Sequence, residues 1–365
     1  MPHHTDGYRA GHPERCFHWC DSNTSGYLGD PTLNSDNDRA ITCSAAGCGI
    51  LEDATFWTDA ECPDRRPGRL AISYLGIDIG GTKVALRADV DGAEAVQTAF
   101  RWGPNGNVHA DLDDLGEQVR ALAARMGEPI ESVGVATPAT LDAAGCVVAW
   151  PNRPSWVGHA LSAGLIALFE GTPVHTADDG DLAAVAEAAE AGCSDLLYVG
   201  VGTGVGGGIV SGGRAIPGAG RGSCELGHVV VALDGPRCDC GRTGCVQAMA
   251  SGPAVLRRAG AGVTFDELRA GLTAAQPWAL DAIREASHAL AAVITGVVEL
   301  TRPELVLVGG GFAMGLPGFV TEIGRQVAGL RRAGHRQPPV RAAALGGVSS
   351  LYGAVQLARN PAVAS

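Results

Sequence analysis

The sequence predicts an α/β fold made of two similar halves around a central cleft. An apolar, strand-like stretch at 71–79 runs through a glycine turn into a second strand at 84–90. The same pattern recurs where the stretch 195–204 runs through a glycine-rich turn into 206–210. The chain has 365 residues, which is enough for two packed domains. A repeated strand–turn–strand unit indicates a duplicated α/β architecture.

Helical periodicity fills the space between these strands. Between 111 and 126, apolar residues recur at steps of three and four, which predicts a helix, and a strand follows at 132–136. In the second half, a helix near 278–300 precedes a strand at 304–308 and three glycines, Gly309, Gly310 and Gly311. We therefore expect a first domain at 70–178, a second at 179–348, and a C-terminal helix at 349–365 that packs back on the first domain.

Residues 1–69 differ from the rest of the chain, because no stretch there keeps a helical or strand period long enough to build a core. They carry five cysteines and several histidines. One interpretation is a small metal knuckle around Cys16, His18 and Cys20. We favour an irregular extension, disordered or produced by a start assigned too far upstream, since no complete ligand set has regular zinc spacing.

The composition excludes several classes of function. A formal net charge of −12 argues against a nucleic-acid partner, which would be bound by clustered Lys and Arg. No apolar run is long enough to cross a bilayer, and the start lacks the pattern of a secretory signal. We therefore expect a cytoplasmic protein with no membrane partner. The odd number of cysteines, 11, favours metal binding over a disulfide framework.

The first chemical signal is the segment from Asp78 to Lys83. Gly80 and Gly81 let backbone N–H groups approach a phosphate without side-chain obstruction. Asp78 can hold the Mg²⁺ shell, Thr82 can donate to phosphate oxygens, and Lys83 adds positive charge. The alternative is an ordinary β-hairpin turn, in which paired glycines are common.

A second turn of this kind begins at Gly202, Thr203 and Gly204 and continues to Gly208. It occupies the matching place in the second half, so two phosphate-binding turns can close on one polyphosphate from both sides. The P-loop pattern G-x-x-x-x-G-K-S/T does not occur.

The sharpest signal is a set of metal-ligand residues after position 227. His228, Cys238, Cys240 and Cys245 match the donor set of tetrahedral Zn²⁺, with glycines that permit tight turns between them. Four protein ligands leave no open position, so this zinc should be structural. The alternative is a group of buried free thiols.

With these motifs the sequence resembles the ROK family, which groups bacterial sugar kinases with related repressors. The resemblance covers about 75–358 and rests on 78–83, 202–208, the zinc segment 225–247 and the three glycines from Gly309. It implies an actin-like ATPase fold (a duplicated ribonuclease H-like unit) with a structural zinc loop. It also implies ATP with Mg²⁺, a hexose as acceptor, and a homodimer. The three glycines then lie on the nucleotide side.

The resemblance also implies a catalytic base. Where the family reads Asn-Asp-Ala-Asn, this chain has Asp178, Asp179, Gly180 and Asp181. Asp179 falls on the residue that takes the proton from the attacking hydroxyl. The alternative for such a cluster is helix N-capping, which Asp178 or Asp181 could perform.

For sugar binding, the resemblance implicates Asn152, Glu225 and His228, the last shared with zinc. Glu225 matches the carboxylate that grips hydroxyls near C1 and C2. Zinc would act indirectly, by holding Glu225 and His228 at the cleft.

Three departures from the family pattern indicate an altered specificity. Asp178 replaces an Asn that contacts hydroxyls near C3 and C4, Gln247 replaces a sugar-binding Glu, and Cys224 replaces a Gly. A carboxylate facing C3 suits an ammonium group, which gains a charge-assisted hydrogen bond. The hypothesis is phosphorylation at O6 of kanosamine (3-amino-3-deoxyglucose), as in antibiotic precursor pathways.

Three alternatives stay open. An ordinary glucokinase would explain Asp178 as drift. A ROK-type repressor would need a basic winged helix, which residues 1–69 do not suggest. A sugar-binding module without kinase activity would show no sugar-dependent ADP release.

Overall fold

The computed structural model describes residues 41–44, 47–50, 72–103, 106–150, 153–218 and 222–364. The chain divides into two compact units, Met1–Arg69 and Leu70–Ser365. In the first unit, β1 (Ile41–Ser44) and β2 (Gly47–Ile50) form an antiparallel hairpin that the sequence analysis did not predict. The suggested ligands Cys16, His18 and Cys20 lie outside the described residues.

The first sheet of the second unit has the order β5-β4-β3-β6-β9. The hairpin pairs β3–β4 and β4–β5 are antiparallel, whereas β3–β6 and β6–β9 are parallel. Its strands are β3 (Ser73–Ile79), β4 (Lys83–Val90), β5 (Val96–Arg101), β6 (Ile130–Thr137) and β9 (Val174–Asp178). We call this sheet and its helices the first lobe.

The second sheet repeats this plan with the order β12-β11-β10-β13-β14. Again the first two pairings are antiparallel and the last two parallel. Its strands are β10 (Leu196–Val201), β11 (Val205–Ser211), β12 (Arg214–Ile216), β13 (Leu305–Gly309) and β14 (Val340–Ala342). This sheet and its helices form the second lobe. The predicted duplication of a strand–turn–strand unit is confirmed.

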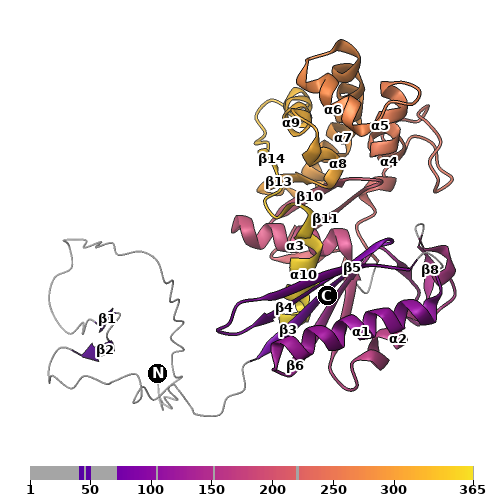
Figure 1. Ribbon diagram of the computed structural model, residues 1–365. Helices are drawn as coiled ribbons and strands as arrows, with labels where there is room; N and C mark the ends of the chain where they lie inside the picture. Colours follow the sequence, from indigo (N-terminus) through magenta and orange to yellow (C-terminus); the bar gives the residue numbers. More distant parts are fainter. Residues whose placement is uncertain are drawn as a thin grey trace, which may run out of the picture. The chain divides into compact units, whose positions relative to one another are not determined.

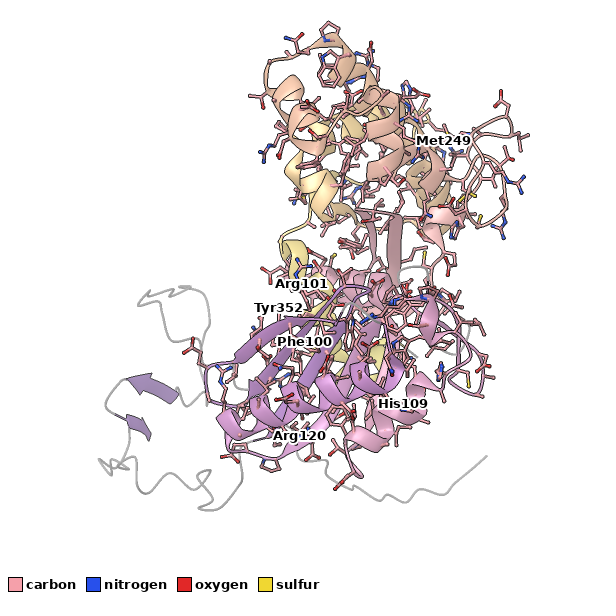
Figure 2. All side chains as sticks on the ribbon, turned by 45° about the vertical axis from the view of Figure 1, so that its right-hand side comes forward. Phe100, Arg101, His109, Arg120, Met249 and Tyr352 are labelled. Carbon is pink, nitrogen blue, oxygen red and sulfur yellow. The ribbon has the colours of Figure 1, made fainter. Side chains whose placement is uncertain are left out.

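Helices cover the outer faces of both sheets. In the first lobe these are α1 (Val108–Met126) and α2 (Leu161–Leu168), with a short hairpin of β7 (Thr140–Leu141) and β8 (Val147–Ala149). The second lobe carries α4 (Val246–Ala250), α5 (Gly252–Ala259), α6 (Phe265–Thr273), α7 (Pro277–Thr301), α8 (Gly311–Gly315) and α9 (Phe319–Gly329). In Figure 2, Met249 marks α4, while His109 and Arg120 mark α1. Among these described helices, none is long and apolar enough to cross a membrane.

The predicted boundaries of two helices agree with the structure to within three residues, whereas the C-terminal helix expected at 349–365 ends at Arg359, because Asn360 before Pro361 is extended and only a short 3₁₀ turn follows. Helix α7 extends the expected helix by one residue at each end. Helix α1 starts at Val108 rather than at 111, because Asn107 caps it: its Oδ1 accepts hydrogen bonds from the backbone N–H groups of His109 and Ala110.

Two helices fill the space between the sheets (Figure 1). Helix α10 (Ser349–Arg359) packs against β3 and β6, and α3 (Asp179–Ala191) packs against β10 and β11. The helices also pack against each other. Gly134 permits the close approach of α10 to β6, since a Cβ there would collide with the backbone of α10. The N-terminal ends of α3 and α10 therefore both reach the region where the lobes meet.

Candidate functional site

A cavity of about 560 Å³ lies where the lobes meet. Its wall includes Asp179 from the start of α3, Thr203 and Gly204 from the turn after β10, and Gly310 after β13. The first lobe contributes Pro138 and Trp150. One cavity thus brings the expected base together with two of the three expected nucleotide-binding segments.

The first glycine turn, Gly80–Lys83, joins β3 to β4 at the end of the hairpin. The Gly80 N–H donates to the Lys83 carbonyl at 2.9 Å, which closes the turn. Trp102 holds the turn from outside, since its indole Nε1 donates to the Gly80 carbonyl at 2.9 Å and its backbone N–H donates to the Thr82 carbonyl at 3.3 Å. Thr82 and Lys83 are exposed.

Asp78 precedes this turn, at the end of β3. Its Oδ2 accepts a hydrogen bond from Ser350 Oγ of α10 at 2.8 Å. Burial raises the pKa of Asp78, while the Ser350 hydroxyl and the Lys83 charge lower it. Asp78 is therefore tied to the helix whose start lines the cavity.

The second glycine turn, Gly202–Gly204, joins β10 to β11 and is braced by the helices that follow the metal-ligand segment. Gln247 Oε1 of α4 accepts a hydrogen bond from the Val205 N–H at 3.3 Å, and the Gly252 N–H donates to the Gly202 carbonyl at 2.9 Å. Gln247, expected to contact sugar, lines the cavity and holds this turn.

Asp178 caps helix α3. Its Oδ1 accepts hydrogen bonds from the N–H groups of Gly180 at 2.9 Å and Asp181 at 3.3 Å. The capping alternative raised by the sequence therefore holds for Asp178. Both bonds use one oxygen, so capping alone does not occupy the second carboxylate oxygen.

The carboxylates at the start of α3 perturb one another. Burial raises the pKa of Asp178 to about 6, with a smaller contribution from Glu225. Burial, then the charges of Asp178 and Asp78, raises the pKa of Asp179 to about 7. Burial and the Asp178 charge raise the pKa of Asp181 to about 7. Negative charge is concentrated here, and a cation would relieve the repulsion.

Glu225 belongs to the segment that faces this cluster. Its Oε1 accepts a hydrogen bond from Ser223 Oγ at 3.0 Å, and the Ser223 hydroxyl also lowers the pKa of Asp178. The neighbouring Cys224 contributes its backbone N–H, which donates to Asp181 Oδ1 at 3.4 Å. Asp181 thereby connects α3 to the residue before Glu225.

The four expected metal ligands converge. The ligand atoms of His228, Cys238, Cys240 and Cys245 lie within 4.8 Å of one another. His228 Nδ1 is 3.7 Å from Cys238 Sγ, and the sulfurs of Cys240 and Cys245 are 3.6 Å apart. Sulfur ligands at about 2.3 Å around a tetrahedral ion would be separated by roughly 3.8 Å. The geometry of the group therefore fits one tetrahedral metal ion.

Gly309, Gly310 and Gly311 connect the end of β13 to the start of α8. Gly309 ends β13, Gly310 precedes α8 with a φ of +86°, and Gly311 begins α8. Of these, Gly310 lines the cavity. Its left-handed backbone and its closeness to Val201 both require a residue without a side chain.

Some expected site residues do not form part of the cavity wall. These are the first glycine turn, Asp78, Asp178, Gly202, Glu225, Gly309, Gly311 and the four expected metal ligands. Asn152 lies outside the described residues.

Sequence reasoning missed Trp102, Trp150, Tyr198, Ser349 and Ser350. The last four line the cavity, and Trp102 holds the first glycine turn. The serines could have been found from the sequence. Two glycines shortly before Ser349 and Ser350, with an apolar run after them, are typical of the start of a helix. The aromatic residues gave no such signal.

The model of the ROK family matches residues 74–361. This chain belongs to the ROK family. The family has an actin-like α/β fold with mixed sheets, which agrees with the two sheets described above.

A curated relative, a kanosamine kinase from Amycolatopsis mediterranei (strain S699), is 52% identical over 289 residues, which is 78% of this chain and 95% of that protein. Among solved structures, a ROK hexokinase from Thermus thermophilus has a TM-score of 0.71 and 31% identity, over 79% of this chain and 98% of that chain. A ROK family glucokinase from Streptomyces griseus in complex with glucose and AMPPNP has a TM-score of 0.65 and 27% identity, over 79% of this chain and 99% of that chain.

Proposed function

We propose that this chain transfers the terminal phosphoryl group of ATP to the 6-hydroxyl of kanosamine. That the chain is a sugar kinase follows from its family and from its 52% identity to a curated sugar kinase. The observation that carries the proposal is the position of Asp179. This carboxylate lies on the wall of the same cavity as Thr203, Gly204 and Gly310.

Asp179 acts as the general base. Phosphoryl transfer depends mainly on positioning and electrostatic stabilisation, and a carboxylate orients the attacking hydroxyl and takes its proton. A base works best when its pKa lies near the working pH. Burial and the neighbouring charges of Asp178 and Asp78 raise the pKa of Asp179 to about 7, which meets this condition.

ATP with Mg²⁺ is the donor, and the two glycine turns divide its binding. Asp78 is a hard oxygen ligand suited to the Mg²⁺ shell, and Lys83 adds positive charge beside it. Thr203 and Gly204 offer donors to the phosphates, and we assign the glycines from Gly309 to the nucleotide side. Magnesium would neutralise phosphate charge next to a cluster of carboxylates whose pKa values are raised mainly by burial and further by neighbouring negative charges.

Kanosamine is favoured over glucose because its ammonium group would lie next to carboxylates. Asp178 uses only Oδ1 to cap α3, and the charge of Glu225 raises its pKa further. An ammonium would neutralise this charge and gain a charge-assisted hydrogen bond, whereas a hydroxyl would not. The 52% identity to the Amycolatopsis mediterranei protein supports the same substrate.

Zinc is the ion assigned to His228, Cys238, Cys240 and Cys245, since three thiolates and an imidazole form a closed tetrahedral donor set. Its role is structural: it would fix the segment that carries Glu225 and leads to α4. Elemental analysis of the purified protein should find one zinc per chain, and its absence from active protein would refute the assignment. The homodimer, the cytoplasmic location and the lack of a nucleic-acid partner remain predictions of the sequence analysis.

The test is a coupled ADP-release assay with ATP and Mg²⁺ against glucose, mannose, N-acetylglucosamine, glucosamine and kanosamine. We expect the highest kcat/KM on kanosamine. Glucose as the best substrate would identify an ordinary glucokinase, a second candidate favoured by the likeness to the Streptomyces griseus glucokinase. If no sugar were phosphorylated, the proposed kinase activity would be refuted.

A further inference from the structure

A buried carboxylate of α3 holds the segment that leads into α10. Glu187 is 0% exposed. Its Oε2 accepts a hydrogen bond from the Ala344 N–H at 2.9 Å, and its Oε1 accepts one from the Leu345 N–H at 3.0 Å. The same Oε1 also accepts a hydrogen bond from Ser349 Oγ at 2.7 Å. One side chain therefore fixes both ends of the turn at 344–349.

This turn forms part of the cavity wall and reaches Asp78. The residues of the turn and of the start of α10 that line the cavity are Gly346, Gly347, Ser349 and Ser350. Ser350 Oγ donates to Asp78 Oδ2 at 2.8 Å, at the end of β3. A continuous chain of hydrogen bonds and backbone therefore runs from Glu187 through the start of α10 to Asp78.

The partners of Glu187 indicate that it holds this turn rather than balancing a charge. In the described part of the chain they are neutral donors, two backbone N–H groups and one hydroxyl. A buried carboxylate without a cation beside it is costly unless its hydrogen bonds are made. Val348, the residue before α10, gives the helix no side-chain cap, so the carboxylate of Glu187 takes its place near the positive end of the helix dipole.

We infer that Glu187 is a positioning residue for the nucleotide donor. The inference rests on the proposed function, in which Asp78 belongs to the Mg²⁺ shell and the cavity holds ATP. Glu187 fixes the start of α10, and the start of α10 fixes the Ser350 hydroxyl. That hydroxyl orients the carboxylate of Asp78, as residues behind a metal ligand commonly do.

The test measures binding of a non-hydrolysable ATP analogue by calorimetry at increasing Mg²⁺ concentrations. In Glu187→Gln one carboxylate oxygen becomes an amide nitrogen, which accepts no hydrogen bond, so the turn at 344–349 loses at least one of its three bonds. We expect the Mg²⁺ concentration for half-maximal binding to rise about tenfold, as for other residues that orient metal ligands. Affinity for kanosamine should stay near the wild-type value.

Ser350→Ala tests the last step between Glu187 and Asp78. It removes the hydroxyl that donates to Asp78 and should raise the Mg²⁺ requirement by a similar factor. Because both substitutions act on the same carboxylate, adding Glu187→Gln to Ser350→Ala should raise the requirement little further. Effects that multiply in the double variant would mean that Glu187 does not act through Ser350, and would overturn the inference.

The matched control is Glu190→Gln, the same substitution at an exposed position one turn further along α3. It should leave the Mg²⁺ requirement unchanged. A wild-type requirement in Glu187→Gln, even with a lower melting temperature, would show a role in the fold alone and overturn the inference. If Glu187→Gln does not fold, Ser350→Ala decides, and a wild-type requirement there overturns the inference. Failure of the proposed function is a separate result, because the wild type itself would then phosphorylate no sugar.

Discussion

The two glycine turns occupy equivalent places in the two sheets, yet they differ in charge and in support. The first joins β3 to β4 and is flanked by Asp78 and Lys83, whereas Gly202–Gly204 carries no charged side chain. Trp102, which directly follows β5, holds the first turn, while Gln247 and Gly252, which follow the expected metal-ligand segment, hold the second. Duplication accounts for the shared topology, and the residues added to each half account for the chemistry.

This difference assigns distinct tasks to the turns. The first offers a carboxylate and an ammonium, so it suits a metal ion and phosphate charge. The second offers backbone N–H groups and one hydroxyl, so it suits neutral hydrogen bonds to phosphate oxygens. Asp179 belongs to neither turn and lies on the cavity wall where the lobes meet.

The largest effect is expected from Asp179→Asn, which removes the base and leaves both turns intact. We expect kcat to fall about 10³-fold, because general bases contribute roughly 10² to 10⁴. Sugar and nucleotide affinities should change little. Steady-state kinetics and calorimetry measure both, and a kcat within tenfold of the wild type would rule out this role.

The melting temperature of Asp179→Asn shows whether any loss of activity comes from misfolding. The pKa of Asp179 is raised in the folded state, so its contribution to stability is fully present below its unfolded pKa and is lost as the pH rises through about 7. Asn at this position cannot ionise, so the variant does not lose stability in this way as the pH rises. Asp179→Asn should therefore melt no lower than the wild type at pH 8, and a large drop in melting temperature would mean that lost activity reflects misfolding.

The next effect is a pH dependence. Because the carboxylate form of Asp179 is active and burial raises its pKa to about 7, kcat/KM should fall about tenfold per pH unit below pH 7. The residual activity of Asp179→Asn should lack this limb. A wild-type profile that stays flat down to pH 5 would contradict the assignment.

Variants that alter one glycine turn at a time should have the smallest effects on activity. Asp78→Asn should weaken binding of Mg²⁺ with ATP by roughly 10- to 100-fold, since an interaction with a charged group is lost. Thr203→Ala removes one neutral hydrogen bond and should raise the KM for ATP about fivefold. Magnesium titrations separate the two, because only Asp78→Asn should shift the metal requirement. Equal effects would mean that the turns do not divide the task.

The sequence predicted most of the fold because its signals are local. Glycines between apolar stretches predicted both hairpins, and apolar periodicity predicted α1. The cap at Asn107 lets that helix begin three residues earlier than expected. The hairpin β1–β2 was missed, because its strands of four residues are too short for a clear alternation pattern.

The site was predicted less completely, since part of it depends on contacts between distant residues. Asp78 and Ser350 are 272 positions apart, and Val205 and Gln247 are 42 apart. Their residue types are common, so only folding shows that they meet. The cluster of expected metal ligands was predicted because His228 and the three cysteines lie close together in the sequence and belong to residue types that bind metals.

The measurement that tests the central claim most directly is the discrimination between kanosamine and glucose by Asp178→Asn. Asn can still cap α3 through its Oδ1, so the helix should remain intact. We predict that the ratio of kcat/KM for kanosamine to kcat/KM for glucose falls about 10- to 100-fold, the value of one charge-assisted hydrogen bond. An unchanged ratio would contradict the account and leave Asp178 as a helix cap alone.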